Sequence, residues 1–281
     1  MSTRFGVDYA WGRPSTTSLK NAGVTFVCRY FSHDTTGKNL NLAEAERLSK
    51  DFDLVTVWET TAKRPLSGHS AGVQDAKDAL VQAKLCKMPD NAPIFFAADW
   101  DVASSQMSTL VSYLKGANEV LHVNRTGLYG GVAAVRNAFN AGVIAYGWQT
   151  YAWSGGKWDD RALLQQYSND HTIGGVGLDY DHGRGNFGYW RVGGVSPNPA
   201  PKPTAPPFPG RILHYPPVMG GNDVHMWQAQ MHKRGWNIGV DGWYGSQSRT
   251  VCTKFQTEKK LHVDGTVGPQ TWKATWASPV T

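Results

Sequence analysis

The sequence predicts an α/β fold: a small (β/α)8 barrel of the TIM type, followed by a separate three-helix bundle. Three observations predict it. Strand-like and helix-like segments alternate up to residue 183, a proline-rich stretch follows, and the rest of the chain repeats a short motif. The chain has 281 residues, which is enough for one large domain and one small domain.

The first part of the chain alternates between apolar runs typical of buried strands and longer segments with helical spacing of apolar residues. A repeated strand–helix pattern favours a parallel sheet, and eight strands fit a closed barrel, although a doubly wound sheet shares the pattern. In chain order we expect strand 5–11, helix 16–23, strand 24–32, helix 41–52, strand 53–60, helix 70–86, strand 92–102, helix 107–121, strand 125–131, helix 132–142, and strands 144–152, 162–168 and 176–183.

Residues 193–210, GGVSPNPAPKPTAPPFPG, contain seven prolines. Such a stretch tends to extended polyproline II structure and would span roughly 55 Å at about 3.1 Å per residue. We interpret it as a semi-rigid linker between domains 1–192 and 211–281.

The C-terminal part contains an internal repeat, VDGWYGSQS (240–248) and VDGTVGPQT (263–271). The Asp-Gly pairs mark turns, and Ser246 and Pro269 stand where helices are expected to begin. Apolar residues at helical spacing predict three short amphipathic helices, and therefore a small bundle.

Charge and composition limit the class of protein. The net charge is +6, and residues 211–281 hold eight of the 28 basic and four of the 22 acidic residues. This charge is not gathered into a groove-reading element, so nucleic-acid binding is not expected. No run of about 18 apolar residues is present, so we expect no membrane insertion. The N-terminus lacks the pattern of a signal peptide, so synthesis in a host cytoplasm is expected.

Cysteine and histidine patterns give no indication of a metal or cofactor. The three cysteines have no CxxC spacing and are expected to be small buried hydrophobic residues, and the nine histidines form no HExxH motif. We therefore predict no cofactor and no metal, and we expect a monomer.

Acidic residues follow several of the predicted strands. In FFAADWDV (95–102), an apolar strand runs into two aspartates one residue apart, which alternation would place on the same face. One aspartate alone is more often a helix cap or a turn residue, but several at strand ends favour one shared site at the C-terminal end of a barrel. The candidate catalytic residues are Asp8, Glu59, Asp99, Asp101 and Asp179.

Clustered carboxyl groups can bind a hard cation, or they can hydrolyse a glycoside, which needs one protonated and one ionised carboxyl. The many aromatic residues expected at the same end of the barrel favour a sugar substrate. The candidate substrate-binding residues are Tyr129, Trp148, Tyr151, Gln166, Tyr167 and Asp181.

The motifs GVDYA, FVCRYF, VWE, AADWDV, LYGG, QQYS and GLDYDHG occur in this order over roughly residues 4–190. In this the chain resembles the glycoside-hydrolase-like domain related to family 25 lysozymes. That family carries an Asp on strand one, an Asp-x-Glu on strand four and an Asp on strand eight. The resemblance implies matching roles for Asp8, Asp99, Asp101 and Asp179, with Asp101 in place of the proton-donating Glu and Glu59 as the other candidate donor.

The C-terminal domain resembles the peptidoglycan-binding type 1 domain over the segment from Asp223 to Trp272. Together the two resemblances imply a lysozyme-like or muramidase-like hydrolase of peptidoglycan with a wall anchor, an architecture similar to that of a phage endolysin, which acts at the wall after release by a holin. Bacterial peptidoglycan is the expected partner.

Two alternatives remain open. The first is a wall-binding protein with a degenerate, inactive barrel, which the absence of the strand-four Glu favours. The second is an esterase or amidase that uses Ser70, because GHSAG (68–72) matches the nucleophile motif G-x-S-x-G. That motif needs a strand that leads directly into the serine, whereas here the strand is expected to end near Thr60. Ser70 is therefore expected to cap the following helix.

Overall fold

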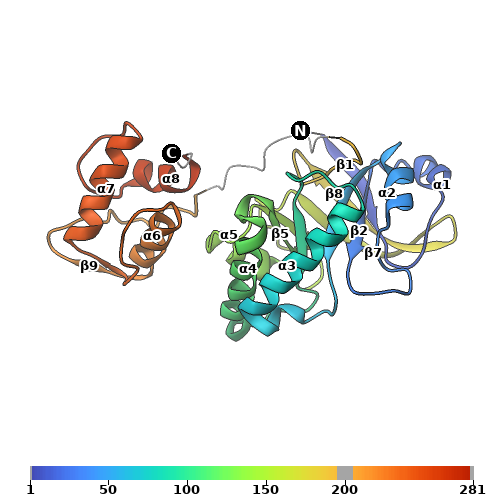
Figure 1. Ribbon diagram of the computed structural model, residues 1–281, viewed down its shortest axis with the longest axis horizontal. Helices are drawn as coiled ribbons and strands as arrows, with labels where there is room; N and C mark the ends of the chain where they lie inside the picture. The colour runs from blue at the N-terminus through green and yellow to red at the C-terminus, as the bar shows by residue number, and fades with distance from the viewer. Residues whose placement is uncertain (1, 195–204, 279–281) are drawn as a thin grey trace. The chain divides into compact units, whose positions relative to one another are not determined.

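The computed structural model describes residues 2–194 and 205–278, and the chain divides into two compact units, Met1–Pro201 and Lys202–Thr281 (Figure 1). Each unit has its own hydrophobic core. Most of the predicted linker over residues 193–210 lies outside the described residues. The predicted domain limits at residues 192 and 211 therefore remain predictions.

The first unit is a closed barrel of eight strands in chain order, as the alternation of segments predicts. All eight strands and five helices expected in this unit are present, and each observed end lies within five residues of the expected one. The strands are β1 (Thr3–Asp8), β2 (Phe26–Phe31), β3 (Asp53–Trp58), β4 (Ile94–Ala97), β5 (Thr126–Gly130), β6 (Tyr146–Thr150), β7 (Leu164–Ile173) and β8 (Val176–Arg184).

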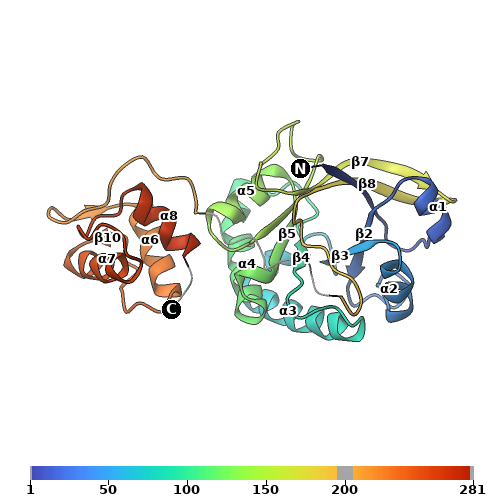
Figure 2. The ribbon, with the colours of Figure 1, turned by 90° about the horizontal axis from the view of Figure 1, so that it is seen from above.

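The barrel is not fully parallel, which differs from the expected parallel sheet. Strands β1 to β7 pair in parallel, whereas β8 is antiparallel to both β7 and β1. The reason is the Gly174–Gly175 turn, where both residues have positive φ, at 59° and 79°. Two such residues form the tight turn of a hairpin, and a hairpin joins antiparallel strands. Figure 2 shows β7 and β8 as one long two-stranded ribbon.

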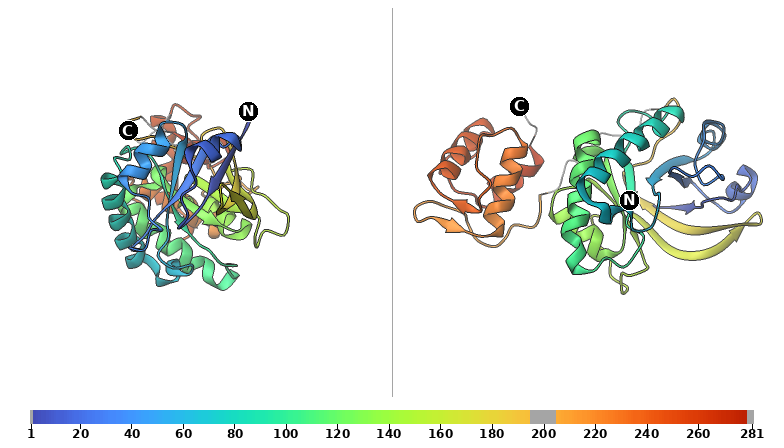
Figure 3. Two further views of the ribbon diagram at one scale, coloured as in Figure 1. Left: turned by 90° about the vertical axis from the view of Figure 1, so that its right-hand side faces the viewer. Right: turned by 60° about the horizontal axis from the view of Figure 1, so that its bottom comes forward.

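Five helices follow the first five strands: α1 (Thr16–Asn21), α2 (Leu42–Ser49), α3 (Gly68–Leu85), α4 (Met107–Leu121) and α5 (Val132–Asn140). Strands β2 to β6 are buried on both faces, toward the barrel interior and toward the helices. In β3, Val55 and Val57 belong to the core inside the barrel, whereas Leu54 and Trp58 belong to the core between the strands and the helices. The helices on one side of the barrel are seen in Figure 3.

The helix pair α3 and α4 packs closely, and two glycines make this possible. A Cβ at Gly72 would lie 1.9 Å from the Tyr113 carbonyl oxygen, and one at Gly116 would lie 2.1 Å from the His69 carbonyl oxygen. Such distances are too short for any side chain, so glycine is required at both positions. The last glycine of the GHSAG segment thus has a packing role between helices.

The second unit is built around the three predicted helices, α6 (Asn222–Lys233), α7 (Ser246–Glu258) and α8 (Pro269–Ala277), with a small antiparallel pair of strands, β9 (Met219–Gly220) and β10 (Trp243–Tyr244). The predicted helix starts at Ser246 and Pro269 are confirmed. Its core contains Trp227, Tyr244, Phe255 and Trp272, all buried.

The internal repeat of the second unit has one structural explanation in both copies. Gln228 of α6 donates to Asp241 Oδ1 at 2.9 Å, and Gln256 of α7 donates to Asp264 Oδ1 at 2.8 Å. Each glutamine also accepts, at 2.8 Å, from the N–H of the glycine that follows its aspartate. Each Asp-Gly turn is therefore fixed by a buried amide, so the repeat preserves this structural support.

The three cysteines are free and buried, as expected for small hydrophobic residues. Across the described ranges no helix is long and apolar enough to cross a membrane. Within those same ranges, no group of three or more His, Cys, Asp or Glu side chains is arranged to hold a metal ion.

Candidate active site

A cavity of about 180 Å³ opens at the end of the barrel where β1 to β7 terminate. The side chains that line it come from the seven strands β2 to β8 and from the segments that follow β3 and β4. They are Tyr30, Val57, Glu59, Ala97, Asp99, Tyr129, Trp148, Gln166, Asn169 and Asp179. Three of the five predicted catalytic carboxyl groups, and three of the six predicted substrate-binding residues, are among them.

One wall of the cavity is built by β7 and β8, and Asp8 of β1 contacts this wall without lining the cavity itself. Closure of the barrel pairs Asp8 directly with Asp179, as expected for the first and last strands. The buried Gln166 of β7 joins them, because its Nε2 donates to Asp8 Oδ2 at 2.9 Å and to Asp179 Oδ2 at 3.1 Å. Its Oε1 accepts from Tyr129 at 2.9 Å and from Thr150 at 2.8 Å. These bonds orient the amide, so its N–H groups face the carboxyl groups.

Asp8 is almost fully buried, with 3% of its surface exposed. Burial, followed by the charge of Asp179, raises the pKa of Asp8 to about 7, although hydrogen bonds from Gln166 and Tyr30 oppose this shift. Asp8 is therefore a carboxyl that exchanges its proton near neutral pH.

Asp181 lies deeper in the barrel than the sequence suggests, because it pairs with Gly6 and is fully buried. Trp148 Nε1 donates to its Oδ1 at 2.8 Å. Burial, and then the charge of Asp8, raise the pKa of Asp181 well above its ordinary value. Asp181 is not among the residues that line the cavity, so it supports Trp148 and Asp8 from behind.

Asp179 has a different environment, although its pKa is also raised, mainly by partial burial. The backbone N–H of Asp170 donates to Asp179 Oδ1 at 3.0 Å, while Gln166 donates to Oδ2. Each carboxyl oxygen of Asp179 thus accepts a hydrogen bond, an arrangement that favours its ionised form.

The opposite wall follows β3 and β4. Asp99 is half-buried, and its pKa is raised by burial and then by the charge of Glu59, while Lys38 opposes the rise. Glu59 forms an ion pair with Lys38, with 3.1 Å between Oε1 and Nζ. On this wall the carboxyl groups of Glu59 and Asp99 line the cavity, as Asp179 does on the other wall, and Lys38 neutralises Glu59 from outside the lining.

The structure does not bring Asp101 into this cluster, contrary to the expectation that it shares a face with Asp99. Strand β4 ends at Ala97, so strict alternation does not continue to residue 101. Asp101 is exposed and is absent from the residues that line the cavity.

Of the aromatic residues predicted to bind substrate, some line the cavity and others do not. Tyr129 and Trp148 line the cavity, whereas Tyr151 follows the end of β6, is 45% exposed and is not part of the lining. Tyr167 was expected at the site and is instead on the outer face of β7, because its neighbour Gln166 points inward. Its ring stacks on His182 with 3.8 Å between centroids.

Ser70 is exposed in the first turn of α3 and does not line the cavity. The expected cap is also wrong. The helix begins at Gly68, its N-cap residue is Ser67, and no side chain caps it.

Three residues of the site were missed by the sequence reasoning. Tyr30 lies two positions after Cys28 on the inward face of β2, so strand alternation could have identified it. Asn169 follows an irregularity in β7 that shifts the register, and its Oδ1 has no hydrogen-bond partner within the described part of the chain. Lys38 lies in a loop, where periodicity gives no information.

The chain was compared with known proteins. Residues 17–183 match the family model described as "Rv2525c-like, glycoside hydrolase-like domain", and residues 220–274 match "Putative peptidoglycan binding domain". A Mycobacterium tuberculosis protein named "Putative peptidoglycan hydrolase Rv2525c" is 30% identical over 200 residues, which is 66% of this chain and 82% of that protein.

Two solved structures illustrate the likeness. The crystal structure of the Tat-secreted M. tuberculosis protein Rv2525c with L-tartrate is 30% identical, with a TM-score of 0.63, and the match covers 67% of this chain and 98% of that one. The Clostridium perfringens spore cortex lytic enzyme SleM is 13% identical, with a TM-score of 0.50 over 65% of this chain and 67% of that one, and shares the fold.

These comparisons correct one expectation. Synthesis in a host cytoplasm without a signal peptide is contradicted, because the related M. tuberculosis protein is Tat-secreted, which points to export with a signal peptide. The barrel, its cavity of carboxyl groups and the family match over residues 17–183 agree with one another. The chain belongs to the Rv2525c-like, glycoside hydrolase-like domain family.

Proposed function

We propose that this protein is a hydrolase of bacterial peptidoglycan, in which the barrel cleaves glycosidic bonds of the glycan in the manner of a lysozyme or muramidase. The name of the related M. tuberculosis protein supports the substrate, and the glycoside hydrolase-like family supports the reaction. The C-terminal unit holds the enzyme on the wall, which the peptidoglycan-binding match over residues 220–274 supports.

One observation carries the proposal: carboxyl groups face one another across a cavity lined by aromatic and amide side chains. Glycoside hydrolysis needs a protonated carboxyl beside the leaving oxygen and an ionised carboxyl near the sugar C1. Asp99 on one wall and Asp179 on the other have environments suited to these two states, because Asp99 lies beside Glu59 and Asp179 accepts two N–H bonds.

In this mechanism Asp99 donates its proton to the glycosidic oxygen as the bond from that oxygen to C1 breaks. The carboxylate of Asp179 stabilises the positive charge that develops on the sugar. Water then supplies a hydroxyl group to C1, and its remaining proton restores the acid. Gln166 and Asp8 are positioning residues, since they fix the Asp179 carboxylate.

This assignment moves the proton donor from Asp101 to Asp99, because an exposed carboxyl outside the cavity cannot reach a bound glycosidic oxygen. Tyr129, Trp148 and the unpaired Oδ1 of Asn169 supply the contacts for the sugar. An aromatic ring covers a sugar face, and the amide oxygen accepts from a sugar hydroxyl.

The proposal also includes three more specific points: the protein acts as an endolysin, it is related to family 25 lysozymes, and it acts as a monomer. Binding to the wall rests on the C-terminal unit, whose residues 211–281 hold eight basic and four acidic residues and so carry +4 of the net charge of +6. Positive charge suits the anionic polymers of a cell wall.

A second candidate function is binding without catalysis. The position of Asp101, exposed and away from the cavity, favours it, because the strand-four Glu of the lysozyme pattern then has no counterpart in the site.

Digestion of purified peptidoglycan distinguishes the candidates. The proposal predicts new reducing ends from the wild-type protein and a loss of at least about 100-fold with Asp99→Asn. Release of free amines instead would indicate an amidase. No product from the wild-type protein over the full pH range of its stability, with wall binding retained, would indicate the binding protein.

A further inference from the structure

Lys38 places a cation beside the cavity, in contact with two residues that line it, and the proposed mechanism gives it no role. Its Nζ lies 3.1 Å from Glu59 Oε1 and 4.7 Å from the centre of the Tyr30 ring. Both of these partners line the cavity. The Lys38 side chain is only 11% exposed, so its charge is poorly screened by solvent.

The loop that carries Lys38 is braced from within. Asp34 Oδ1 accepts from the backbone N–H of Thr36 at 2.9 Å and from that of Lys38 at 3.0 Å. Asn39 Nδ2 donates to the carbonyl oxygens of Ser32 at 2.9 Å and Asp34 at 2.7 Å. These bonds fix the backbone at Lys38 without using its ammonium group.

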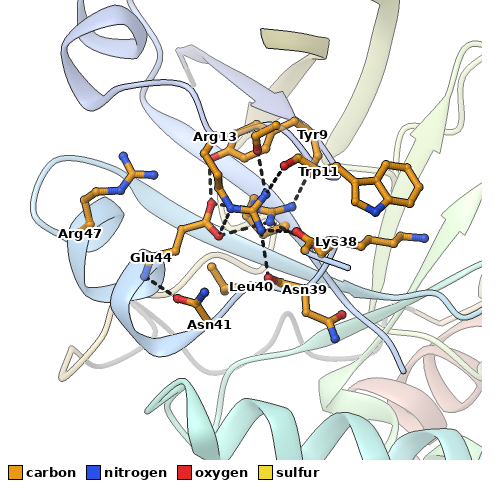
Figure 4. Close-up of polar contacts among 12 residues, drawn as sticks. Tyr9, Trp11, Arg13, Lys38, Asn39, Leu40, Asn41, Glu44 and Arg47 are labelled. Atoms are coloured by element: carbon orange, nitrogen blue, oxygen red, sulfur yellow. Dashed lines mark hydrogen bonds and ion pairs between the residues drawn. The ribbon is translucent and has the colours of Figure 1, made fainter. Parts of the chain in front are cut away.

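An ionic cluster of Arg13, Arg29 and Glu44 contacts the same loop (Figure 4). Arg29 of β2 is fully buried, donates to Glu44 Oε1 at 3.0 Å, and donates through Nη2 to the Lys38 carbonyl oxygen at 3.1 Å. Arg13 pairs with Glu44 Oε2 at 2.8 Å and donates to the carbonyl oxygens of Gly37 and Asn39.

Two guanidinium groups therefore hold three successive carbonyl oxygens of one loop, those of residues 37–39. A buried arginine is costly unless it is paired and hydrogen-bonded, and here both arginines share one carboxylate. In Figure 4 the side chains of Lys38 and Trp11 extend together away from this cluster.

The cation acts on both carboxyl groups of its wall. It is paired with Glu59, and its charge opposes the rise in the pKa of Asp99 that burial and Glu59 cause. The other groups that act on Asp99 are Asp179 across the cavity and the phenols of Tyr30 and Tyr129. Without Lys38, Glu59 would lose its partner and present an unbalanced charge to Asp99.

We propose that Lys38 is a positioning residue of the cavity: its ammonium, on a loop anchored by Arg29, Arg13 and Glu44, holds the Glu59 carboxylate on the wall that also carries Asp99. The electrostatic consequence is that its charge also acts on Asp99. The catalytic part of this inference rests on the proposed function, in which Asp99 is the proton donor. The electrostatic part is measurable whether or not the protein cleaves glycan.

The test compares Lys38→Met, Lys38→Arg and the wild type in the full-length protein. Methionine keeps the apolar stem but removes the charge, and the loop keeps the backbone bonds that brace it. Lys20→Met is the matched control, since Lys20 forms an ion pair with Asp51 at 2.8 Å in an exposed position. Folding is checked by circular dichroism.

The first measurement is a pH titration of aspartate carboxyl ¹³C resonances, with Asp99→Asn used to identify the Asp99 signal. We expect the Asp99 midpoint to rise by about one pH unit in Lys38→Met, because an opposite charge within reach of a carboxyl lowers its pKa by about one to three. Lys38→Arg should restore the midpoint, and Lys20→Met should not change it. An unchanged midpoint in a folded Lys38→Met protein would overturn the proposal.

The second measurement is the pH profile of kcat/KM on soluble glycan fragments. The alkaline limb should move upward with the Asp99 midpoint in Lys38→Met and return in Lys38→Arg. If the wild type is active and the alkaline limb of Lys38→Met is unchanged, the proposed role of Lys38 is wrong, whereas the proposed hydrolase is unaffected. A wild type that releases no reducing ends would overturn the proposed hydrolase, while the titration would still decide whether Lys38 tunes Asp99.

Discussion

Asp8→Asn should make the stability of the barrel less dependent on pH. The pKa of Asp8 is raised in the folded protein from 3.8 to about 7, first by burial and then by the charge of Asp179. A carboxyl with a raised folded-state pKa favours folding while it is protonated. That stability is lost as the pH rises from the unfolded value through the folded value, here between about pH 4 and pH 7.

The size of this loss follows from the same two values. At about 1.4 kcal/mol per pH unit, the interval from 3.8 to about 7 corresponds to about 4 kcal/mol of folding free energy. Asp8 is buried, so solvent screening does not reduce this contribution. Asparagine cannot ionise. Its NH₂ group beside Gln166 changes the free energy of unfolding by the same amount at both pH values, so this change cancels when the two pH values are compared.

The assay is urea unfolding of the wild type and Asp8→Asn at pH 4 and pH 8, with the free energy of the barrel transition compared between the two pH values. The wild type should lose about 4 kcal/mol more than the variant on going to pH 8. Asp101→Asn, which changes an exposed carboxyl outside the cavity, is the control and should follow the wild type. Equal losses in wild type and Asp8→Asn would refute the reasoning that Asp8 ionises at the cost of stability.

Three further outcomes are expected. Asp99→Asn should lower the release of reducing ends by about 10²–10⁴-fold in a folded protein, while Asp101→Asn should stay within a few-fold of the wild type; the reverse order would return the donor to Asp101. Ser70→Ala should leave peptidoglycan cleavage and circular dichroism unchanged, because Ser70 is exposed on α3; an inactive but folded variant would revive the esterase alternative. Deleting residues 193–281 should leave cleavage of soluble fragments similar and reduce lysis of whole walls by roughly 10- to 100-fold. Equal sedimentation of both proteins with walls would show that the C-terminal unit is not the anchor.

The order and type of most barrel elements could be predicted because strands β2 to β6 are buried on both faces and the helices have apolar sides. The meeting of Asp8 with Asp179 also followed from barrel closure alone. The antiparallel direction of β8 was missed, although the Gly174–Gly175 pair is a typical hairpin turn. An antiparallel β8 runs away from the mouth of the barrel, so recognising that turn would also have placed Asp181 deeper in the barrel than Asp179.

The errors at the site have local causes. Alternation predicts side-chain direction only inside a strand, and β4 stops at Ala97, before Asp101. Tyr167 belongs to the same motif as Gln166, but only Gln166 lines the cavity, while the Tyr167 ring stacks on His182. Lys38 was beyond prediction, since its position depends on contacts to its loop from β2, from α2 and from the segment between β1 and α1, and no periodic pattern describes them.

The central claim is that the barrel hydrolyses a glycosidic bond, and digestion of purified peptidoglycan in H₂¹⁸O tests it most directly. Hydrolysis adds the hydroxyl of water to the sugar C1, so mass spectrometry should find one ¹⁸O at each new reducing end with the wild type and almost none with Asp99→Asn. Fragments without ¹⁸O at the sugar terminus, or ¹⁸O found in released peptides instead, would contradict the account.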